Sequence, residues 1–263
     1  YIPSDSYLKE ELLPEKQTFN KFDVPEHIFN LTNNVPWNKL YLKEFITKNK
    51  LQYQAIKQAN DTYFTIMALF LAERITYVKD VLIAYRVNND ESLSGKASDT
   101  VFCAYDSWLY AKEHIEKYPD FNLVRFSFLS RALSGFYHAL NIQTTFESYE
   151  KLYRKLVEEG FHEFGLDECT EENIYAVWMY KDMQKMYETE PADFLVQKSI
   201  TRRVNNENNN VRRKILREKN AVLRENVQAL KEDKKTLQSD KKKLQEEKKK
   251  LEGEKKKLQK EID

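Results

Sequence analysis

The most constraining feature of this sequence is a leucine at every seventh position in its C-terminal part. These leucines are Leu216, Leu223, Leu230, Leu237, Leu244, Leu251 and Leu258. Because an α-helix has 3.6 residues per turn, residues seven apart lie close to the same face, and this is the spacing of position d in a coiled-coil heptad. The sequence therefore predicts a coiled-coil helix over residues 211–263.

The other seam position, a, is mostly polar. It is occupied by Asn220, Val227, Lys234, Lys241, Lys248, Lys255 and Ile262. Each a-position lysine follows an acid at position g, namely Asp233, Asp240, Glu247 and Glu254. These acids can pair with lysines across a parallel dimer, and Asn at a favours two strands in register, so we expect a homodimer through the coiled coil. Lysine at a weakens the seam, and a solvated single helix with i,i+4 charge pairs is the alternative.

Charge is distributed unevenly along the chain. From Lys198 onward there are 22 Lys+Arg and 12 Asp+Glu, whereas the preceding residues carry 21 and 30. Two parts of opposite charge suggest two roles. The tail lysines interleave with acids and no aromatic or base-reading motif accompanies them, so we expect no nucleic-acid partner. Peripheral contact with an anionic membrane surface is a second interpretation of the same charge.

The composition of the remaining chain predicts a compact, mostly helical part. Residues 100–197 read as a helical subdomain, followed by a polar join over 198–210 in which "NNENNN" favours flexibility. One helix is predicted by apolar residues near a 3.6 period: Val124, Phe128, Leu129, Ala132, Phe136 and Leu140. Another begins at "TTFE", with Thr144 as its cap and Glu147 as the capping-box partner.

Residues 1–99 mix helix and strand signals, so the fold class expected is α+β but mostly helical. A short helix over 37–50 would bury Leu40, Phe45 and Ile46, and a second helix covers 61–73. The run "ITYVKDVLIAYRV" from Ile75 predicts two short strands. The sequence contains no run of about 18 apolar residues, which is the length that would predict a membrane span. The two cysteines lack metal-ligand spacing. Both observations favour a cytoplasmic protein.

Three segments of the N-terminal part carry a family resemblance. They are Trp37–Tyr41 ("WNKLY"), the pair Asn60-Asp61 at a predicted helix start, and Ala84-Tyr85-Arg86 followed by Ser92-Leu93-Ser94. Their order and spacing over about residues 20–95 resemble the acceptor-side half of bacterial family 2 glycosyltransferases of the GT-A fold. The resemblance implies that residues 1–99 are a partial GT-A domain.

The resemblance also implies roles for individual residues. Asp61 would be the general base of an inverting transfer, removing the proton from the attacking acceptor hydroxyl. The residues expected to bind the acceptor are Trp37, Asn38, Lys39 and Asn60, and those expected to reach the donor diphosphate are Arg86, Ser92 and Ser94. The structural alternatives are a helix-start carboxylate, a core Trp and an ion-paired Arg.

The chain departs from the family pattern in two ways. Its acidic pair reads Asn-Asp, and it lacks the nucleotide-binding half with the metal-binding D-x-D. We therefore expect a piece of a longer protein, inactive alone, whose intact form uses Mg or Mn held outside this chain. The function expected is transfer of a sugar from a nucleotide-sugar donor to a glycan hydroxyl in cell-surface synthesis, at the inner face of the membrane. The alternative is a non-enzymatic coiled-coil scaffold carrying a degenerate transferase domain.

Overall fold

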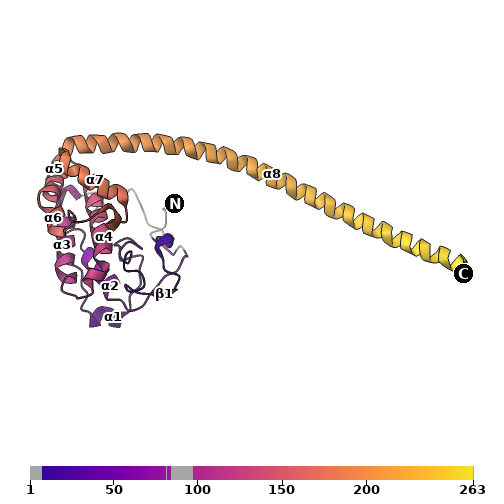
Figure 1. Cartoon of the computed structure of the whole chain (residues 1–263), viewed down its shortest axis with the longest axis horizontal. Helices are drawn as coiled ribbons and strands as arrows, with labels where there is room; N and C mark the ends of the chain where they lie inside the picture. The colour runs from indigo at the N-terminus through magenta and orange to yellow at the C-terminus, as the bar shows by residue number, and fades with distance from the viewer. Residues whose placement is uncertain (1–7, 81, 84–96, 263) are drawn as a thin grey trace. The chain divides into compact units, whose positions relative to one another are not determined.

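The chain is described by a computed structural model that covers residues 8–80, 82–83 and 97–262 (Figure 1). It divides into two units, Tyr1–Val196 and Gln197–Asp263. The described elements are mostly helical, as the sequence predicts. None of the described helices combines the length and apolar character needed to cross a bilayer.

The first unit is built mainly from helices that follow one another along the chain. They are α1 (Lys43–Lys48), α2 (Thr62–Leu71), α3 (Cys103–Ile115), α4 (Phe121–Asn141), α5 (Phe146–Lys155), α6 (Phe161–Phe164) and α7 (Val177–Glu188), and α8 (Pro191–Ile262) begins in this unit. Three short helical turns accompany them: η1 (Glu10–Leu12) near the start of the described chain, the π-helical turn η3 (Leu156–Gly160) between α5 and α6, and η4 (Glu171–Asn173) before α7.

Helix α4 lies at the centre of the core, against α3, α5 and α7 (Figure 1). All six apolar positions predicted for this helix are at most 4% exposed. Helix α3 approaches α4 so closely that a Cβ on Gly135 would lie 2.2 Å from Nε1 of the buried Trp108, so this contact requires glycine. The core also includes α2, and it is continuous across residues 99 and 100, where the sequence suggested a domain boundary.

The only sheet in the described part of the chain has two strands. Strand β1 (Thr18–Phe19) pairs antiparallel with β2 (Ile75–Thr76). The sequence predicted β2 but not β1, and it wrongly predicted that the strand signal continues through the described residues after Thr76. Residues 77–80 and 82–83 form no strand. The apolar side chains of Val78 and Leu82 are 62% and 72% exposed, so they do not enter the core either.

The helix predicted over 37–50 is shorter than expected. Residues 36–39 form a turn in which the Lys39 N–H donates to the Pro36 carbonyl at 3.1 Å, and the helix starts only at Lys43. Phe45 and Ile46 pack against the core as predicted, but Leu40 is 100% exposed. The prediction for Leu40 was wrong because the turn precedes the helix and directs this residue outward.

Helix α5 begins with a cap, one residue later than predicted. The Thr145 hydroxyl accepts a hydrogen bond from the Ser148 backbone N–H at 3.2 Å, which satisfies a free N–H of the first turn. Thr144 instead contacts the Ser98 hydroxyl at 2.8 Å, and Glu147 pairs with Lys151 at 2.6 Å. The predicted Thr144–Glu147 capping box is therefore not formed.

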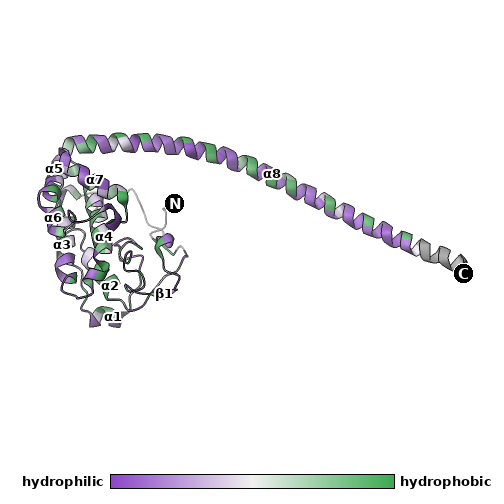
Figure 2. Ribbon diagram, in the orientation of Figure 1, coloured by the Kyte–Doolittle hydropathy of each residue, from purple (hydrophilic) through white to green (hydrophobic). Residues whose placement is uncertain are grey.

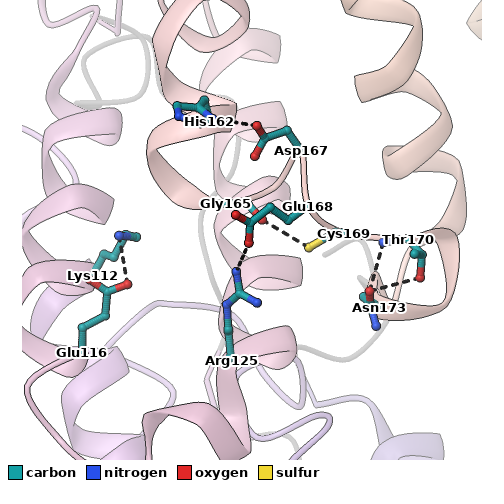
Figure 3. Close-up of polar contacts among 10 residues, drawn as sticks. All are labelled: Lys112, Glu116, Arg125, His162, Gly165, Asp167, Glu168, Cys169, Thr170 and Asn173. Atoms are coloured by element: carbon teal, nitrogen blue, oxygen red, sulfur yellow. Dashed lines mark hydrogen bonds and ion pairs between the residues drawn. The ribbon is translucent and has the colours of Figure 1, made fainter.

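A loop after α6 is fixed by short-range polar contacts (Figure 3). Gly165 ends the helix with φ +72°, and Arg125 of α4 forms an ion pair with Glu168 at 3.0 Å. The Cys169 thiol points back to the Gly165 carbonyl at 3.6 Å. Burial raises the pKa of this thiol to about 11. These contacts hold the loop that leads from α6 towards α7.

The second unit consists of α8 from Gln197 onward, and its backbone is helical through residues 205–210. The expected flexible interruption at "NNENNN" is therefore absent from the helix. Figure 2 shows α8 as mostly hydrophilic with isolated hydrophobic positions. The seam leucines from Leu216 to Leu251 are between 50% and 69% exposed, so they have no partner within the described chain.

Candidate functional site

Asp61 immediately precedes the first residue of α2. This helix is apolar on nearly every face, with Thr62 and Phe64–Phe70 buried, so it is fixed in the core and its start is held in place. The backbone carbonyl of Asp61 accepts the first helical hydrogen bond, from the Thr65 N–H at 2.9 Å. A rigid helix start of this kind holds a side chain in a defined position.

The Asp61 carboxylate is not used to cap the helix. No hydrogen bond joins it to the N–H groups of the first turn. Burial raises the pKa of Asp61, while its own backbone N–H and the charge of Lys39 oppose the rise. A carboxylate with a raised pKa is a stronger base than one in water. The sequence left capping and chemistry open for Asp61, and the geometry excludes the capping role within α2.

The loop before Asp61 is strained and anchored. Ala59 has φ +57°, a left-handed conformation that costs a residue with a side chain free energy and is often found at functional sites. The Asn60 carbonyl accepts a hydrogen bond from the Gln54 N–H at 3.0 Å, and the Gln58 amide oxygen accepts one from the Thr100 hydroxyl. The Asn60 side chain is exposed beside Asp61. These contacts fix the direction in which Asp61 leaves the loop.

Lys39 is surrounded by oxygen atoms of the loop before it. Its Nζ donates to the Asn33 carbonyl at 2.7 Å, the Val35 carbonyl at 2.8 Å and the Asn38 amide oxygen at 2.8 Å. Because an ammonium group has three N–H donors, these bonds use all of them. Lys39 thus holds residues 33–38 in place. It has no donor left for the acceptor contact that the resemblance implies.

Asn38 and Trp37 belong to the same turn. The Asn38 amide also donates to the Thr32 hydroxyl at 3.1 Å, so both of its polar groups contact the chain itself. Trp37 is partly buried, which agrees with either a core or a ring-stacking role. The structure therefore brings Trp37, Asn38 and Lys39 together as one turn.

Lys39 and Asp61 influence each other electrostatically. Burial and, to a smaller extent, the charge of Arg131 together lower the pKa of Lys39 to about 7, although the charge of Asp61 opposes both. Each of the two groups is therefore shifted towards its neutral form by burial and held partly charged by the other. This arrangement places two groups that titrate unusually within one neighbourhood, which is common at functional sites.

Three buried polar atoms near Asp61 have no hydrogen-bond partner in the described part of the chain. They are the Tyr41 hydroxyl, the Thr65 hydroxyl and the Gln54 amide oxygen. Burial raises the pKa of Tyr41, and the neighbouring Thr65 side chain opposes this rise. Buried polar groups are normally satisfied, so unpaired ones mark a place for water or a ligand. The sequence singled out Tyr41 only as the last residue of "WNKLY", and it missed Thr65 and Gln54.

The predicted contacts of the donor diphosphate and the expected metal complete the list of predicted site features. Arg86, Ser92 and Ser94 lie outside the described residues. Within residues 8–80, 82–83 and 97–262, no group of three His, Cys, Asp or Glu side chains is placed to hold a metal ion. The described site therefore offers a base and unpaired hydroxyls but no ligand set for a metal.

Together, these residues can accept a proton and bind hydroxyl groups. Asp61 is a carboxylate base, and Tyr41, Thr65 and Gln54 supply hydrogen-bonding atoms that are not used within the described chain. Comparison with known proteins finds no matching family model, no matching curated protein and no matching solved structure. The glycosyltransferase resemblance therefore stays a prediction, and this geometry is what bears on function.

Proposed function

We propose that residues 1–99 are the acceptor-binding part of a GT-A glycosyltransferase in which Asp61 is the general base. The observation that carries the proposal is the Asp61 carboxylate, which is held at a rigid helix start, is not used as a cap and has a raised pKa. A residue that served only to start the helix would bond to the first-turn N–H groups.

In the proposed reaction, the oxygen of an acceptor hydroxyl attacks the anomeric carbon of a nucleotide-linked sugar. The hydroxyl proton passes to the Asp61 carboxylate, the bond from the anomeric carbon to the diphosphate breaks, and the nucleoside diphosphate leaves with the bonding electrons. The configuration of the sugar is inverted because attack and departure occur on opposite faces. Unpaired atoms of Tyr41 and Thr65 would orient the acceptor, as productive positioning requires.

The donor half of such an enzyme is not assigned to any described residue. The described residues hold no three-ligand group for Mg or Mn, and the Mg or Mn of the intact protein stays part of the proposal, held by residues outside this chain. Arg86, Ser92 and Ser94 stay proposed contacts of the donor diphosphate. Lys39 changes role within the proposal: because its three N–H groups bond to the loop, it shapes the acceptor side without touching the acceptor.

For the tail, we propose a parallel homodimer through the seam of α8. The exposed leucines from Leu216 to Leu251 supply its apolar contacts, and the acids at g can pair with lysines at a. We place the protein on the cytoplasmic side of the cell membrane, where nucleotide sugars and a lysine-rich tail would both meet the surface that grows the glycan.

A non-enzymatic scaffold is the second candidate. The exposed seam favours it, because a helix of this kind can organise an assembly without any chemistry in the first unit. The two proposals differ at Asp61: a scaffold needs no free carboxylate with a raised pKa beside unpaired hydroxyls.

The test is Asp61→Asn in the protein that contains this chain together with its donor-binding half. We expect turnover to fall by about 10²-fold, the usual contribution of a positioned general base, while donor affinity changes little. The matched control is Asp106→Asn, which neutralises another carboxyl with a raised pKa, in the first turn of α3. Near wild-type turnover in the folded Asp61 variant would remove this residue from the mechanism and favour the scaffold.

A further inference from the structure

Phe64 of α2 is the point at which three segments of the first unit meet. The Tyr53 ring stacks on the Phe64 ring, with the two centroids 4.6 Å apart and an angle of 17° between the ring planes. The Tyr41 ring meets Phe64 edge-on, with centroids 5.1 Å apart and an angle of 81°. Because both contacts are made to one buried ring, we refer to Tyr41, Tyr53 and Phe64 as the aromatic cluster.

The aromatic cluster lies beside Asp61. The backbone N–H of Gln54, which follows Tyr53, donates to the Asn60 carbonyl at 3.0 Å, and this bond ties the loop that carries Tyr53 to the residue before Asp61. Thr65 donates its backbone N–H to the Asp61 carbonyl at 2.9 Å. The stacked ring, the carboxylate and the unpaired oxygens of Gln54 and Thr65 therefore belong to one connected site.

Tyr53 is the member of the cluster that a ligand can reach. It is 50% exposed, whereas Phe64 is 4% exposed. One face of the Tyr53 ring lies on Phe64, so its exposed surface is the other face and the ring edge. The stack on a buried side chain also fixes the plane of the ring before any ligand binds, which lowers the entropic cost of binding.

The groups around this ring favour a neutral ligand with several hydroxyl groups. The face of an aromatic ring carries partial negative charge, which attracts the C–H groups on the apolar face of a pyranose. Hydroxyl groups at the edge of such a sugar can donate to Oε1 of Gln54 and exchange hydrogen bonds with the hydroxyls of Tyr41 and Thr65. An anion is disfavoured, because Asp61 is itself acidic and Lys39 has all three N–H groups bonded to its loop.

We propose that Tyr53 is the platform on which a pyranose ring of the acceptor stacks, so that the acceptor is a cyclic sugar and not a linear alcohol such as glycerol. This inference rests on the acceptor-binding role proposed above for residues 1–99. It adds a substrate class and a binding residue that the sequence did not assign. In this arrangement Tyr53 holds the sugar ring, and Asp61 receives the proton of a hydroxyl at the edge of that ring.

The test is binding of methyl β-glucopyranoside to the full chain, followed by NMR with ¹³C-labelled tyrosine rings. The Tyr53 signal is identified as the one missing from Tyr53→Phe. It should shift with the sugar, and glycerol at the same concentration of hydroxyl groups should not move it. Saturation transfer to the sugar C–H protons gives the dissociation constant, which Tyr53→Leu should raise by about fivefold. Tyr53→Phe keeps the ring face and should raise it by less than about twofold.

The matched control is Phe146→Leu. Phe146 is 46% exposed and also stacks on a neighbour, with its centroid 6.5 Å from that of Tyr149, so this variant removes a similar ring elsewhere in the first unit. It should leave sugar binding unchanged. The inference is overturned if the sugar does not move the Tyr53 signal of the wild-type chain or if glycerol moves it equally. It is also overturned if UDP moves the signal and the sugar does not, since the ring would then contact a nucleotide.

This experiment uses no donor and measures no turnover, so its outcome is separate from that of Asp61→Asn. If the chain binds no sugar but the intact protein loses turnover on Asp61→Asn, the role of Tyr53 alone is overturned. If the chain binds the sugar through Tyr53 but turnover survives Asp61→Asn, the sugar site is supported and Asp61 is removed from the mechanism.

Discussion

The two units of this protein use the same helical periodicity with opposite results. In α4 the apolar residues repeat near 3.6 positions and are almost completely buried. In α8 the leucines repeat every seven positions just as regularly, yet Leu230 and Leu237 are 66% and 69% exposed. Regular apolar spacing therefore predicts that a helix forms. It does not show whether the same chain supplies the surface against which the apolar face of that helix packs.

The difference follows from how much of each helix surface is apolar. Helix α4 has apolar residues over a wide face and small residues such as Gly135 and Ala132 that let neighbouring helices approach. The leucine seam of α8 is narrow and is flanked by lysines at a, so it cannot join a wide core. The first unit is stabilised by packing within one chain, whereas the tail needs a second copy or pairs of charges along its surface.

The largest expected effect comes from removing two seam leucines. Leu230→Ala with Leu237→Ala deletes d-layer contacts that each contribute about 2–3 kcal/mol by analogy with buried leucines. The dissociation constant of the dimer should rise by about 10³-fold or more. The Tm of the first unit should not change. Sedimentation equilibrium and far-UV circular dichroism of the full chain at several concentrations measure both quantities.

The matched control for the leucine pair is Val222→Ala. Val222 is 56% exposed on the same helix but occupies position c, outside the seam, so its removal should leave the dimer intact. If the wild-type chain is monomeric at hundreds of micromolar, the tail is a solvated helix, and the seam does not join two copies.

A smaller effect is expected from filling the contact between α3 and α4. Gly135→Ala places a methyl group 2.2 Å from Nε1 of Trp108, so one of the two helices must move. Overpacking of this kind costs about 1–3 kcal/mol, which corresponds to a fall in Tm of about 4–8 °C for a midrange cost in a unit of this size. Thermal unfolding followed by tryptophan fluorescence reports the change, because Trp108 is buried at this contact.

The same substitution in the tail should act in the opposite direction. A Cβ on Gly253 would meet nothing within 4 Å, and Ala favours a helix over Gly by about 1 kcal/mol. Gly253→Ala should therefore increase the helical content of the tail and leave the Tm of the first unit unchanged. A loss of helix on this change would show that the tail surface at Gly253 is covered by another chain.

The helices could be predicted from the sequence because their signals are local. The apolar spacing of α4 and the short apolar run of α2 each predict a helix. The predictions were less accurate where contacts with residues distant in the sequence determine the structure. Leu40, Val78 and Leu82 carry apolar or β-branched signals, but the turn at Pro36 and the short strand β1 leave them exposed. Contacts between distant residues override a local propensity.

The site shows the same division. Asp61 and Lys39 were named from a local motif, and the structure places them in one electrostatic neighbourhood. Arg131 was not singled out from the sequence, because only the folded chain brings its side chain to Asn34. Nor could the sequence show that Lys39 donates all three of its N–H groups to its own loop.

Lysines extend the comparison between the two units. Lys39 is enclosed by loop oxygens, whereas the seam lysines of the tail, such as Lys241 and Lys248, are exposed. Nζ of Lys243 lies 3.9 Å from Oδ1 of Asp240. Exposed i,i+3 ion pairs of this kind contribute little to stability. The burial of Lys39 is expected to make the stability of the protein depend on pH.

The last expected effect is a change in how the free energy of unfolding depends on pH. Burial lowers the pKa of Lys39 from 10.5 to about 7 in the folded protein. Between these two values the unfolded chain binds more protons than the folded one, so the free energy of unfolding contributed by Lys39 increases as pH rises from about 7 to 10.5. Below pH 7 both states hold the proton and this contribution is constant.

Lys39→Met removes the contribution, and it also removes the loop bonds, which lowers stability at every pH. Urea unfolding of both proteins across this range should show a steeper rise in the wild type, and Arg131→Gln should narrow the window by raising the pKa of Lys39. Parallel pH profiles for the wild type and Lys39→Met would mean that Lys39 keeps its proton in the folded protein throughout this range.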